Sequence, residues 1–318
     1  MFLVVALHIN TVGGALEGSA AGSAQWWIAD FVQIAAYCCV DCFALATGFL
    51  MAERGFRPGR IVSLWLQVAF YSVVTAAAWY FIVPGRIGLR YIASSFFPAL
   101  TSKYWYFTAY FVLFFFTPFL NALLRALDAR GRKMLLAALL VFFSLLPTFR
   151  PLNVIPLSGG YCFFWLAALY LIGGCVKLDR LYECASGKFF VLTYFSSAAV
   201  MLLWQLLFGA DNVRLISYLS PTVLVCSAAL LCAFCRMRVP DKLTGRRKIF
   251  EHNFLRCVSY PYKPLYTEHV LCRRLCLHRQ NERMARAPVR ARLRIGDIRC
   301  VYADRVPAAK AVCDLRYR

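Results

Sequence analysis

Two side chains in apolar stretches of this 318-residue sequence are suited to proton chemistry. His8 is the single histidine before Met237, and imidazole takes up and returns a proton near neutral pH. Asp41 lies inside an apolar run that ends near Met51, where a carboxylate is costly unless it faces a protein interior or water. Each residue has two interpretations: a hydrogen-bonded packing residue, or a working group in which His8 is a base and Asp41 its partner.

The composition indicates which class of protein positions these residues. Hydrophobic residues make up 61% of the chain and aromatic residues 16%, whereas soluble domains contain about 45–50% apolar residues. The sequence therefore predicts an all-α fold, namely a polytopic transmembrane helix bundle in an integral membrane protein. We expect seven full spans plus a partial first helix at residues 1–8. The predicted spans cover residues 26–52, 60–83, 104–124, 134–148, 158–177, 188–209 and 214–235.

Basic residues predict the orientation, because they cluster in every second loop between the spans. The clusters comprise Arg54, Arg57 and Arg60; Arg125, Arg130, Arg132 and Lys133; Lys177, Arg180 and Lys188; and Arg236, Arg238 and Lys242. Cytoplasmic loops carry an excess of Lys and Arg, so all four clusters are expected in the cytoplasm.

The chain changes character near Met237. From there on it contains 20 Lys or Arg and 7 Asp or Glu, and no Trp. We therefore divide it into a membrane-embedded domain at residues 1–236 and a basic, low-order tail at residues 237–318. The few aromatic residues of the tail are not interleaved with its arginines, so no nucleic-acid partner is expected.

The 14 cysteines predict neither a disulfide scaffold nor a metal site. Nine of them lie in or beside apolar helices, where Cys behaves as a small hydrophobic residue. Cys272, Cys276 and His278 loosely resemble a ligand cluster, but no second pair of suitable spacing accompanies them. We expect no metal.

Three segments, in order along the chain, resemble motifs of one known family. Residues 4–8 (VVALH) are similar to "VV-x-x-H", residues 40–51 (VDCFALATGFLM) to "VDLFF…SGFL", and residues 103–120 (KYWYFTAYFVLFFFTPFL) to "LWFL…L…PLL". These are motifs of the acyltransferase 3 family, membrane-embedded enzymes that acylate sugars and other acceptors. The resemblance covers residues 1–236.

The resemblance implies transfer of an acetyl group from cytoplasmic acetyl-CoA to a hydroxyl of a cell-envelope glycan or lipid-linked sugar. It places the chain in the lipid of a bacterial inner membrane. It implies His8 as the catalytic base, and we expect Asp41 to orient or charge the imidazole. Other residues keep a structural alternative. Arg57 and Arg60 hold the CoA phosphates or anchor the membrane surface, and Trp105 and Tyr106 line the substrate site or pack at the interface.

The family pattern also gives expectations about the two ends of the chain. It implies an Arg eleven residues before the histidine of the first helix, a position that here falls before Met1, so the N-terminus is expected to be truncated. Codons for residues 254–264 (FLRCVSYPYKP), read one base later, permit SFGVYLIHTN, which is similar to a motif of the family's last helices. We therefore expect the tail to be out of frame.

Two other functional classes remain open from the sequence. One is a transporter or flippase for lipid-linked sugars, in which His8 and Asp41 relay protons. The other is an inactive fragment of the enzyme. The sequence does not determine the oligomeric state.

Overall fold

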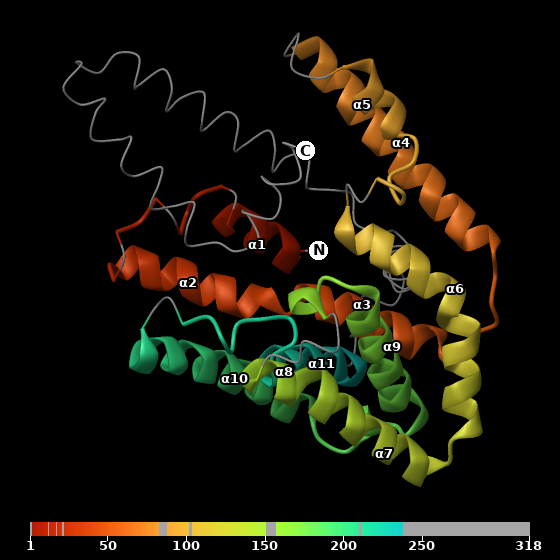
Figure 1. The fold of residues 1–318 in the computed structure, drawn as a ribbon. Helices are drawn as coiled ribbons and strands as arrows, with labels where there is room; N and C mark the ends of the chain where they lie inside the picture. Colours follow the sequence, from red (N-terminus) through yellow and green to blue (C-terminus); the bar gives the residue numbers. More distant parts are fainter. Residues whose placement is uncertain are drawn as a thin grey trace, which may run out of the picture. The chain divides into compact units, whose positions relative to one another are not determined.

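The computed structural model describes residues 2–237, apart from residues 12, 17, 21, 83–87, 102–103, 151–156 and 210–211. The predicted tail, its out-of-frame interpretation and the Cys272, Cys276 and His278 group lie outside the described residues. Every regular element in the described part is helical, which confirms the all-α prediction (Figure 1). The elements are α1 (Phe2–Thr11), α2 (Ala24–Tyr37), α3 (Cys39–Met51), α4 (Gly59–Ile82), α5 (Leu89–Ser94), α6 (Trp105–Ala126), α7 (Ala129–Leu139), the π-helix η1 (Leu140–Leu145), α8 (Leu146–Phe149), the 3₁₀ turn η2 (Ser158–Gly160), α9 (Phe163–Leu178), the 3₁₀ turn η3 (Leu181–Glu183), α10 (Gly187–Phe208) and α11 (Pro221–Arg236).

Five helical stretches in the described part are long and apolar enough to cross a membrane. They are Ala24–Met51, Gly59–Ile82, Trp105–Ala126, Ala129–Phe149 and Gly187–Phe208. They correspond to five of the seven predicted spans. The other two predicted spans contain helices of 16 residues, α9 and α11, which fall just short of the roughly 17–25 residues of a typical span. The structure thus supports a multi-pass membrane protein without establishing the count of seven.

Helix α3 packs most closely on α9, through two glycines that face each other's backbone. A Cβ added at Gly48 would overlap the backbone of Tyr170, and a Cβ added at Gly173 would overlap the backbone of Leu45. Small residues permit this close approach between membrane helices. The contact buries Leu45 completely and fixes the face of α3 that carries Asp41.

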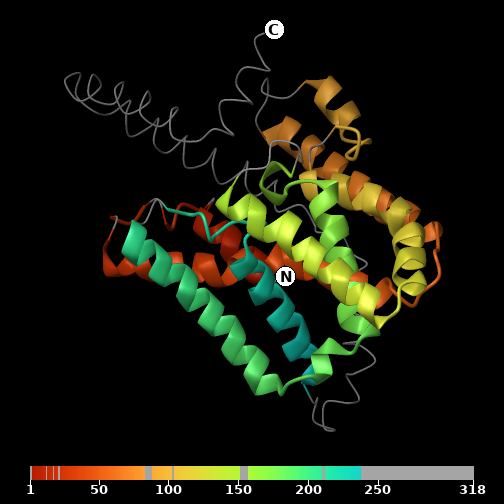
Figure 2. The ribbon, with the colours of Figure 1, turned by 60° about the horizontal axis from the view of Figure 1, so that its bottom comes forward.

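The other helices pack around this pair. Helices α10 and α11 lie side by side (Figure 2), with Ala198 and Met201 packed in one buried cluster with Val223 and Cys226. Pro118 lies within α6, where it removes a backbone hydrogen bond and bends the helix (Figure 1).

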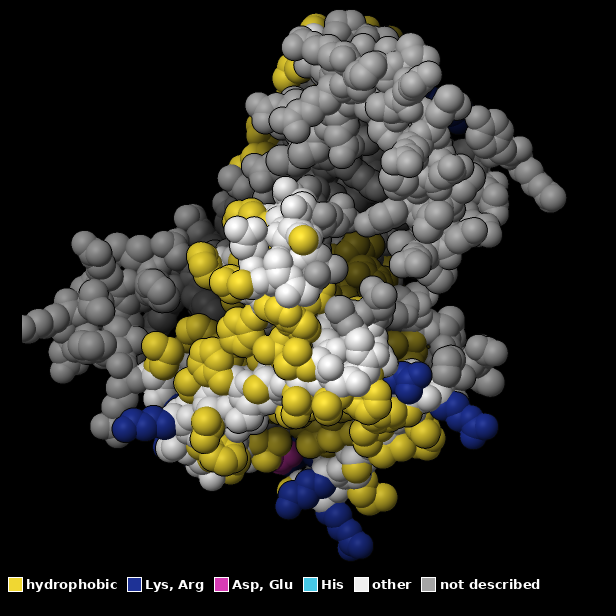
Figure 3. Space-filling model, turned by 90° about the vertical axis from the view of Figure 1, so that its left-hand side faces the viewer, with side chains coloured by type: hydrophobic (Ala, Val, Ile, Leu, Met, Phe, Trp, Pro, Cys, Tyr) yellow, Lys and Arg dark blue, Asp and Glu magenta, His cyan; other side chains and the backbone are white. Residues whose placement is uncertain are grey.

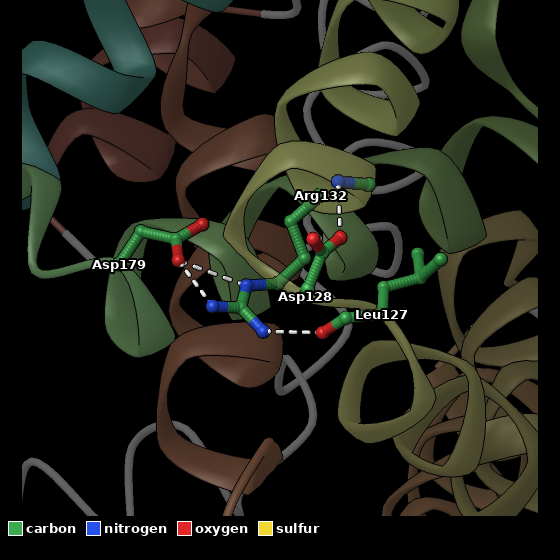
Figure 4. A network of polar contacts seen from close by, with 5 residues as sticks. Leu127, Asp128, Arg132 and Asp179 are labelled. Carbon is green, nitrogen blue, oxygen red and sulfur yellow. Dashed lines mark hydrogen bonds and ion pairs between the residues drawn. The ribbon is translucent and has the colours of Figure 1, made fainter.

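Described members of all four predicted basic clusters lie at one end of the bundle, which we call the basic end. Lys177 at the end of α9 pairs with Glu53 after α3 at 3.7 Å. Arg132 of α7 donates from Nη2 to Asp179 at 2.5 Å and from Nη1 to the carbonyl of Leu127 at 2.6 Å (Figure 4).

Two more contacts complete the basic end. Arg125 of α6 donates to the carbonyl of Ala52 at 3.4 Å. Arg236 of α11 lies beside Gly187, next to Lys188. The helix ends therefore alternate as the positive-inside rule predicts, and we call the opposite end, where α2, α6, α9 and α11 begin, the outer end.

Hydrophobic side chains face outward over much of the bundle. On the face in Figure 3 they cover the middle, and Lys and Arg side chains gather along the lower margin. Exposed examples are Phe70 and Phe81 of α4 and Leu192 and Leu207 of α10. Helices satisfy their backbone hydrogen bonds internally, so such surfaces are compatible with lipid.

Candidate active site

Asp41 is completely buried on α3. The indole Nε1 of Trp165 on α9 donates to its Oδ1 at 3.1 Å. The other oxygen, Oδ2, has no hydrogen-bond partner within the described part of the chain. An unsatisfied buried acceptor costs about 1–3 kcal/mol, so its retention needs an explanation. Asp41 therefore presents one acceptor oxygen that a hydroxyl group of a ligand would satisfy.

Four aromatic side chains gather near Asp41 and form what we call the outer aromatic cluster. Tyr37 of α2 stacks on Tyr218, with ring centroids 4.7 Å apart. Tyr161 lies 5.1 Å from Tyr218 and 4.6 Å from Trp105. Tyr37 lies four residues before Asp41 in the continuous helical stretch Ala24–Met51. Tyr161 is 49% exposed, so the cluster extends from the surface toward the buried carboxyl group.

The backbone on both sides of the cluster is fixed by local contacts. Gly160 has φ +95°, and a Cβ there would lie 2.6 Å from the Cβ of Tyr218. Ser144, fully buried in the π-helix η1, donates to the carbonyl of Leu219 at 2.7 Å. A π-helical turn within an α-helix often marks a functional site; here it holds the loop that carries Tyr218.

A second aromatic pair continues from Asp41 toward the basic end. Tyr106 of α6 lies against Phe43, two residues after Asp41, with ring centroids 6.4 Å apart, and stacks on Tyr110, one turn further along, at 6.2 Å. Tyr110 packs among the apolar residues around α9 and α4. Tyr106 and Tyr110 are half-buried.

Cations gather where α3 ends. Nη1 of Arg60 lies 3.2 Å from Sδ of Met51. Arg54 and Arg57 precede Arg60 by six and three residues, and both are exposed. The basic end thus has two exposed cations at the surface and one half-buried cation against the end of α3.

His8 lies on α1, half-buried. Its Nδ1 lies 2.8 Å from the carbonyl of Val4, and because a carbonyl only accepts, Nδ1 carries the proton. In the neutral ring Nε2 then holds the lone pair, which is the form that a general base requires.

The packing of α1 sets the level of His8 along the bundle. Asn10 donates to the carbonyl of Ala29 at 2.6 Å, and Val4 packs with Ala36. Helices α1 and α2 therefore run antiparallel (Figure 1), which places His8 roughly two to three turns outward of Asp41 at 1.5 Å per residue.

Comparison with known families decides what kind of protein carries this arrangement. A family model described as an acyltransferase domain matches residues 1–252. The chain belongs to the acyltransferase 3 family. Comparison with curated proteins and with solved structures finds no match. The acyltransferase 3 match includes all the described helices, so it contains Asp41, both aromatic groups and the cations at the end of α3.

The structure brings several predicted site residues of this acyltransferase 3 domain together. Trp105 lies in the outer aromatic cluster, Tyr106 lies against Phe43 near Asp41, and Arg57 lies three residues before Arg60. His8 is on α1, whereas the hydrogen bond of Asp41 is to Trp165 of α9. The direct pairing of His8 and Asp41, like the catalytic roles of both, stays a prediction.

Four neighbours of the site were not predicted from the sequence. They are Tyr110, Tyr161, Trp165 and Tyr218. Their sequence signal was that of interfacial or packing aromatic residues. Within the described ranges no three His, Cys, Asp or Glu side chains gather in a metal-binding group.

Proposed function

We propose that this acyltransferase 3 protein is a membrane O-acyltransferase that moves an acetyl group from acetyl-CoA to a hydroxyl of a cell-envelope glycan or lipid-linked sugar. The observation that carries the proposal is the buried, half-satisfied carboxyl group of Asp41. It lies between an aromatic cluster at the outer end and a cation group at the basic end. The proposal places the chain in the inner membrane of a bacterial cell.

The basic end is suited to the acyl donor. CoA carries phosphate groups, which Arg binds by charge-assisted hydrogen bonds. Arg57 is exposed at the membrane surface and Arg60 lies against the end of α3. In the proposal these two cations hold CoA phosphates while the pantetheine arm enters beside Tyr110. No metal is required, because the thioester is already activated toward an oxygen nucleophile.

The outer end is suited to the acceptor. A sugar ring presents apolar C–H faces, which pack against aromatic rings, and hydroxyl groups, which donate to carboxylates. The outer aromatic cluster offers the rings of Trp105 and Tyr161, and Asp41 offers Oδ2. An acceptor that enters past this cluster would bring a hydroxyl group to Asp41, with Tyr106 nearby against Phe43.

The proposed reaction divides the work between the two polar residues. Nε2 of His8 removes the proton of the acceptor hydroxyl, whose oxygen attacks the thioester carbonyl carbon. Asp41 binds another hydroxyl group of the acceptor and so orients it. The tetrahedral intermediate collapses to the ester and releases CoA thiolate, which takes the proton from the imidazolium. Since His8 lies outward of Asp41, it is on the side from which the acceptor enters.

Membranes that contain the full chain test this proposal when they are incubated with acetyl-CoA labelled in the acetyl group. We expect label in a glycan or lipid-linked fraction and one thiol released for each acetyl group transferred. Label that crosses or stays out of the membrane without thiol release would instead identify a transporter or an inactive fragment.

Replacing the proposed base tests the mechanism. His8→Ala should lower acetyl transfer by roughly 10²–10⁴-fold, the usual contribution of a general base, with membrane insertion and CoA binding unchanged. Asn10→Ala, two residues away, removes a hydrogen bond of the same helix and controls for loss of helix packing. Retained transfer in the His8 variant would remove the assignment.

A further inference from the structure

Two arginine side chains from different helices meet the end of α3. Arg60 of α4 places Nη1 3.2 Å from Sδ of Met51, and Arg125 of α6 donates from Nη2 to the carbonyl of Ala52 at 3.4 Å. The last carbonyl groups of a helix have no partner within it and carry partial negative charge, so they attract cations. Two guanidinium groups from distant parts of the sequence are thus held at consecutive residues.

A chain of buried hydrogen bonds fixes the segment that these arginines contact. The hydroxyl group of Tyr170 on α9 is completely buried and donates to Oδ1 of Asn121 at 2.8 Å. Asn121 of α6 is 6% exposed and donates from Nδ2 to the carbonyl of Met51 at 2.9 Å. Asn121 and Arg125 are one turn apart on α6, so both approach α3 from the same face. The support beneath the two arginines is therefore formed before any ligand binds, which lowers the cost of ordering them.

Among the described residues neither Arg60 nor Arg125 forms an ion pair, and the acids of the basic end have other partners. These partners are Lys177 for Glu53 at 3.7 Å, the backbone N–H of Gly131 for Asp128 at 2.7 Å, Arg132 for Asp179 (Figure 4), and Arg180 for Glu183 at 3.7 Å. A guanidinium group has five N–H donors, and each of the two arginines uses one of them at α3. Both therefore keep their charge and further donors for an anion.

We infer that Arg125 and Arg60 together bind the diphosphate group of the acyl donor. The inference rests on the proposed function and adds Arg125 to its donor-binding residues. In CoA the diphosphate joins the pantetheine arm to the nucleotide, so it lies next to the point where the arm enters the helices. Arg60 and Arg125 contact the end of α3, whereas Arg57 is exposed in the segment that follows it. Arg57 is then the cation for the 3′-phosphate, which is further along the donor molecule.

The Arg125→Gln variant of the full chain, in lipid nanodiscs, tests the inference by equilibrium binding. We expect the Kd for acetyl-CoA to rise roughly tenfold or more, the loss expected for a charge-assisted hydrogen bond. The Kd for acetyl-dephospho-CoA, which keeps the diphosphate and lacks the 3′-phosphate, should rise by the same factor. Arg57→Gln should give the opposite pattern, with a larger loss for acetyl-CoA than for acetyl-dephospho-CoA.

Arg130→Gln is the matched control for the loss of one positive charge. Arg130 is exposed on α7 at the same end of the bundle, five residues after Arg125. Its replacement should leave the Kd of both donors unchanged. Equal weakening in the Arg125 and Arg130 variants would show a general attraction of the basic end for anions and would overturn the inference.

The remaining outcomes separate the inference from the proposed function. An unchanged Kd for acetyl-CoA in Arg125→Gln overturns the inference and leaves the acyltransferase proposal intact. A loss in that variant for acetyl-CoA alone also overturns it, because Arg125 would then contact the 3′-phosphate. Failure of the natural protein to bind or turn over acetyl-CoA removes both.

Discussion

At the scale of single residues, Asp41 departs from what stability alone favours. Its side chain is fully buried, yet one of its two oxygens has no partner among the described residues. Trp165, also fully buried, holds the other oxygen. Ionisable residues within membrane segments generally face a protein interior and mark functional sites. Asp41 faces the protein interior. The proposed function also gives its Oδ2 a role, because a hydroxyl group of the substrate would bind there.

Replacing Asp41 by Asn distinguishes the roles of its two oxygens. Asp41→Asn keeps the size of the side chain and an acceptor for Trp165 but changes the unpaired oxygen into a donor. We therefore expect normal insertion and CoA affinity, and a loss of acetyl transfer of roughly 10²-fold or more, because the acceptor hydroxyl would lose its hydrogen-bond partner. Initial rates with labelled acetyl-CoA measure this.

Asp30 provides the matched control for that substitution. It lies on α2, is 3% exposed and, like Asp41, has an Oδ2 without a hydrogen-bond partner among the described residues. Asp30→Asn should keep the natural rate of transfer. If the Asp41 and Asp30 variants lose activity equally, the proposed special role of Asp41 is wrong.

At the scale of elements, the position of Asp41 depends on the close contact of α3 and α9. Gly48 and Gly173 let the two backbones meet, and Trp165 at the outer part of α9 can then reach Asp41. Close contact between membrane helices is stabilised by van der Waals packing rather than by the hydrophobic effect. Any side chain larger than hydrogen at Gly173 must push the helices apart.

Gly173→Leu should therefore destabilise the domain and move Trp165 away from Asp41. Overpacking costs about 1–3 kcal/mol or more, and the added Cβ would overlap the backbone of Leu45. A lower midpoint of thermal unfolding in detergent checks the prediction. Gly55→Ala is the control, because no atom lies within 4 Å of a Cβ at that position; equal midpoints for the two variants would contradict the packing argument.

The helices themselves could largely be predicted from the sequence, because long apolar runs have few other structures in a membrane. Two predicted spans contain helices of only 16 residues, α9 and α11, and they show where prediction from hydropathy fails. Residues Ser158–Gly160 form a 3₁₀ turn and Pro221 begins α11. The apolar residues before α9 and α11, such as Tyr161 and Tyr218, serve the outer aromatic cluster instead. Hydropathy does not distinguish a buried loop from a helix.

The site could be predicted only in part, for a related reason. An acid in an apolar run is conspicuous, so Asp41 was found. Its partners come from distant segments: Trp165 follows it by 124 residues. Tyr110 and Tyr218 look like ordinary membrane aromatics until packing places Tyr110 beside Tyr106 and Tyr218 beside Tyr37 and Tyr161. The direct pairing of His8 and Asp41 stays a prediction, and the antiparallel packing of α1 and α2 places His8 outward of Asp41 along the bundle.

At the scale of the whole molecule, the arrangement has two chemically different ends. The basic end gathers Arg54, Arg57 and Arg60 with the ion pairs of Lys177 and Arg132. The outer end carries the aromatic cluster. Because the charges predict the side that faces the cytoplasm, acetyl-CoA would bind from the cytoplasm and the acceptor from the opposite side, so transfer would occur across the membrane between them.

Two natural cysteines can test this sidedness. Cys184 is exposed next to η3 at the basic end, and Cys162 precedes α9 at the outer end, where it is half-buried. In variants that keep one of these cysteines and replace all others by Ser or Ala, a membrane-impermeant maleimide should label Cys184 rapidly in inverted vesicles and scarcely in right-side-out vesicles. Cys162, where it reacts, should show the opposite preference. The same preference for both cysteines would contradict a span between them, and reversed preferences would place the donor-binding arginines outside the cell, where acetyl-CoA is not supplied.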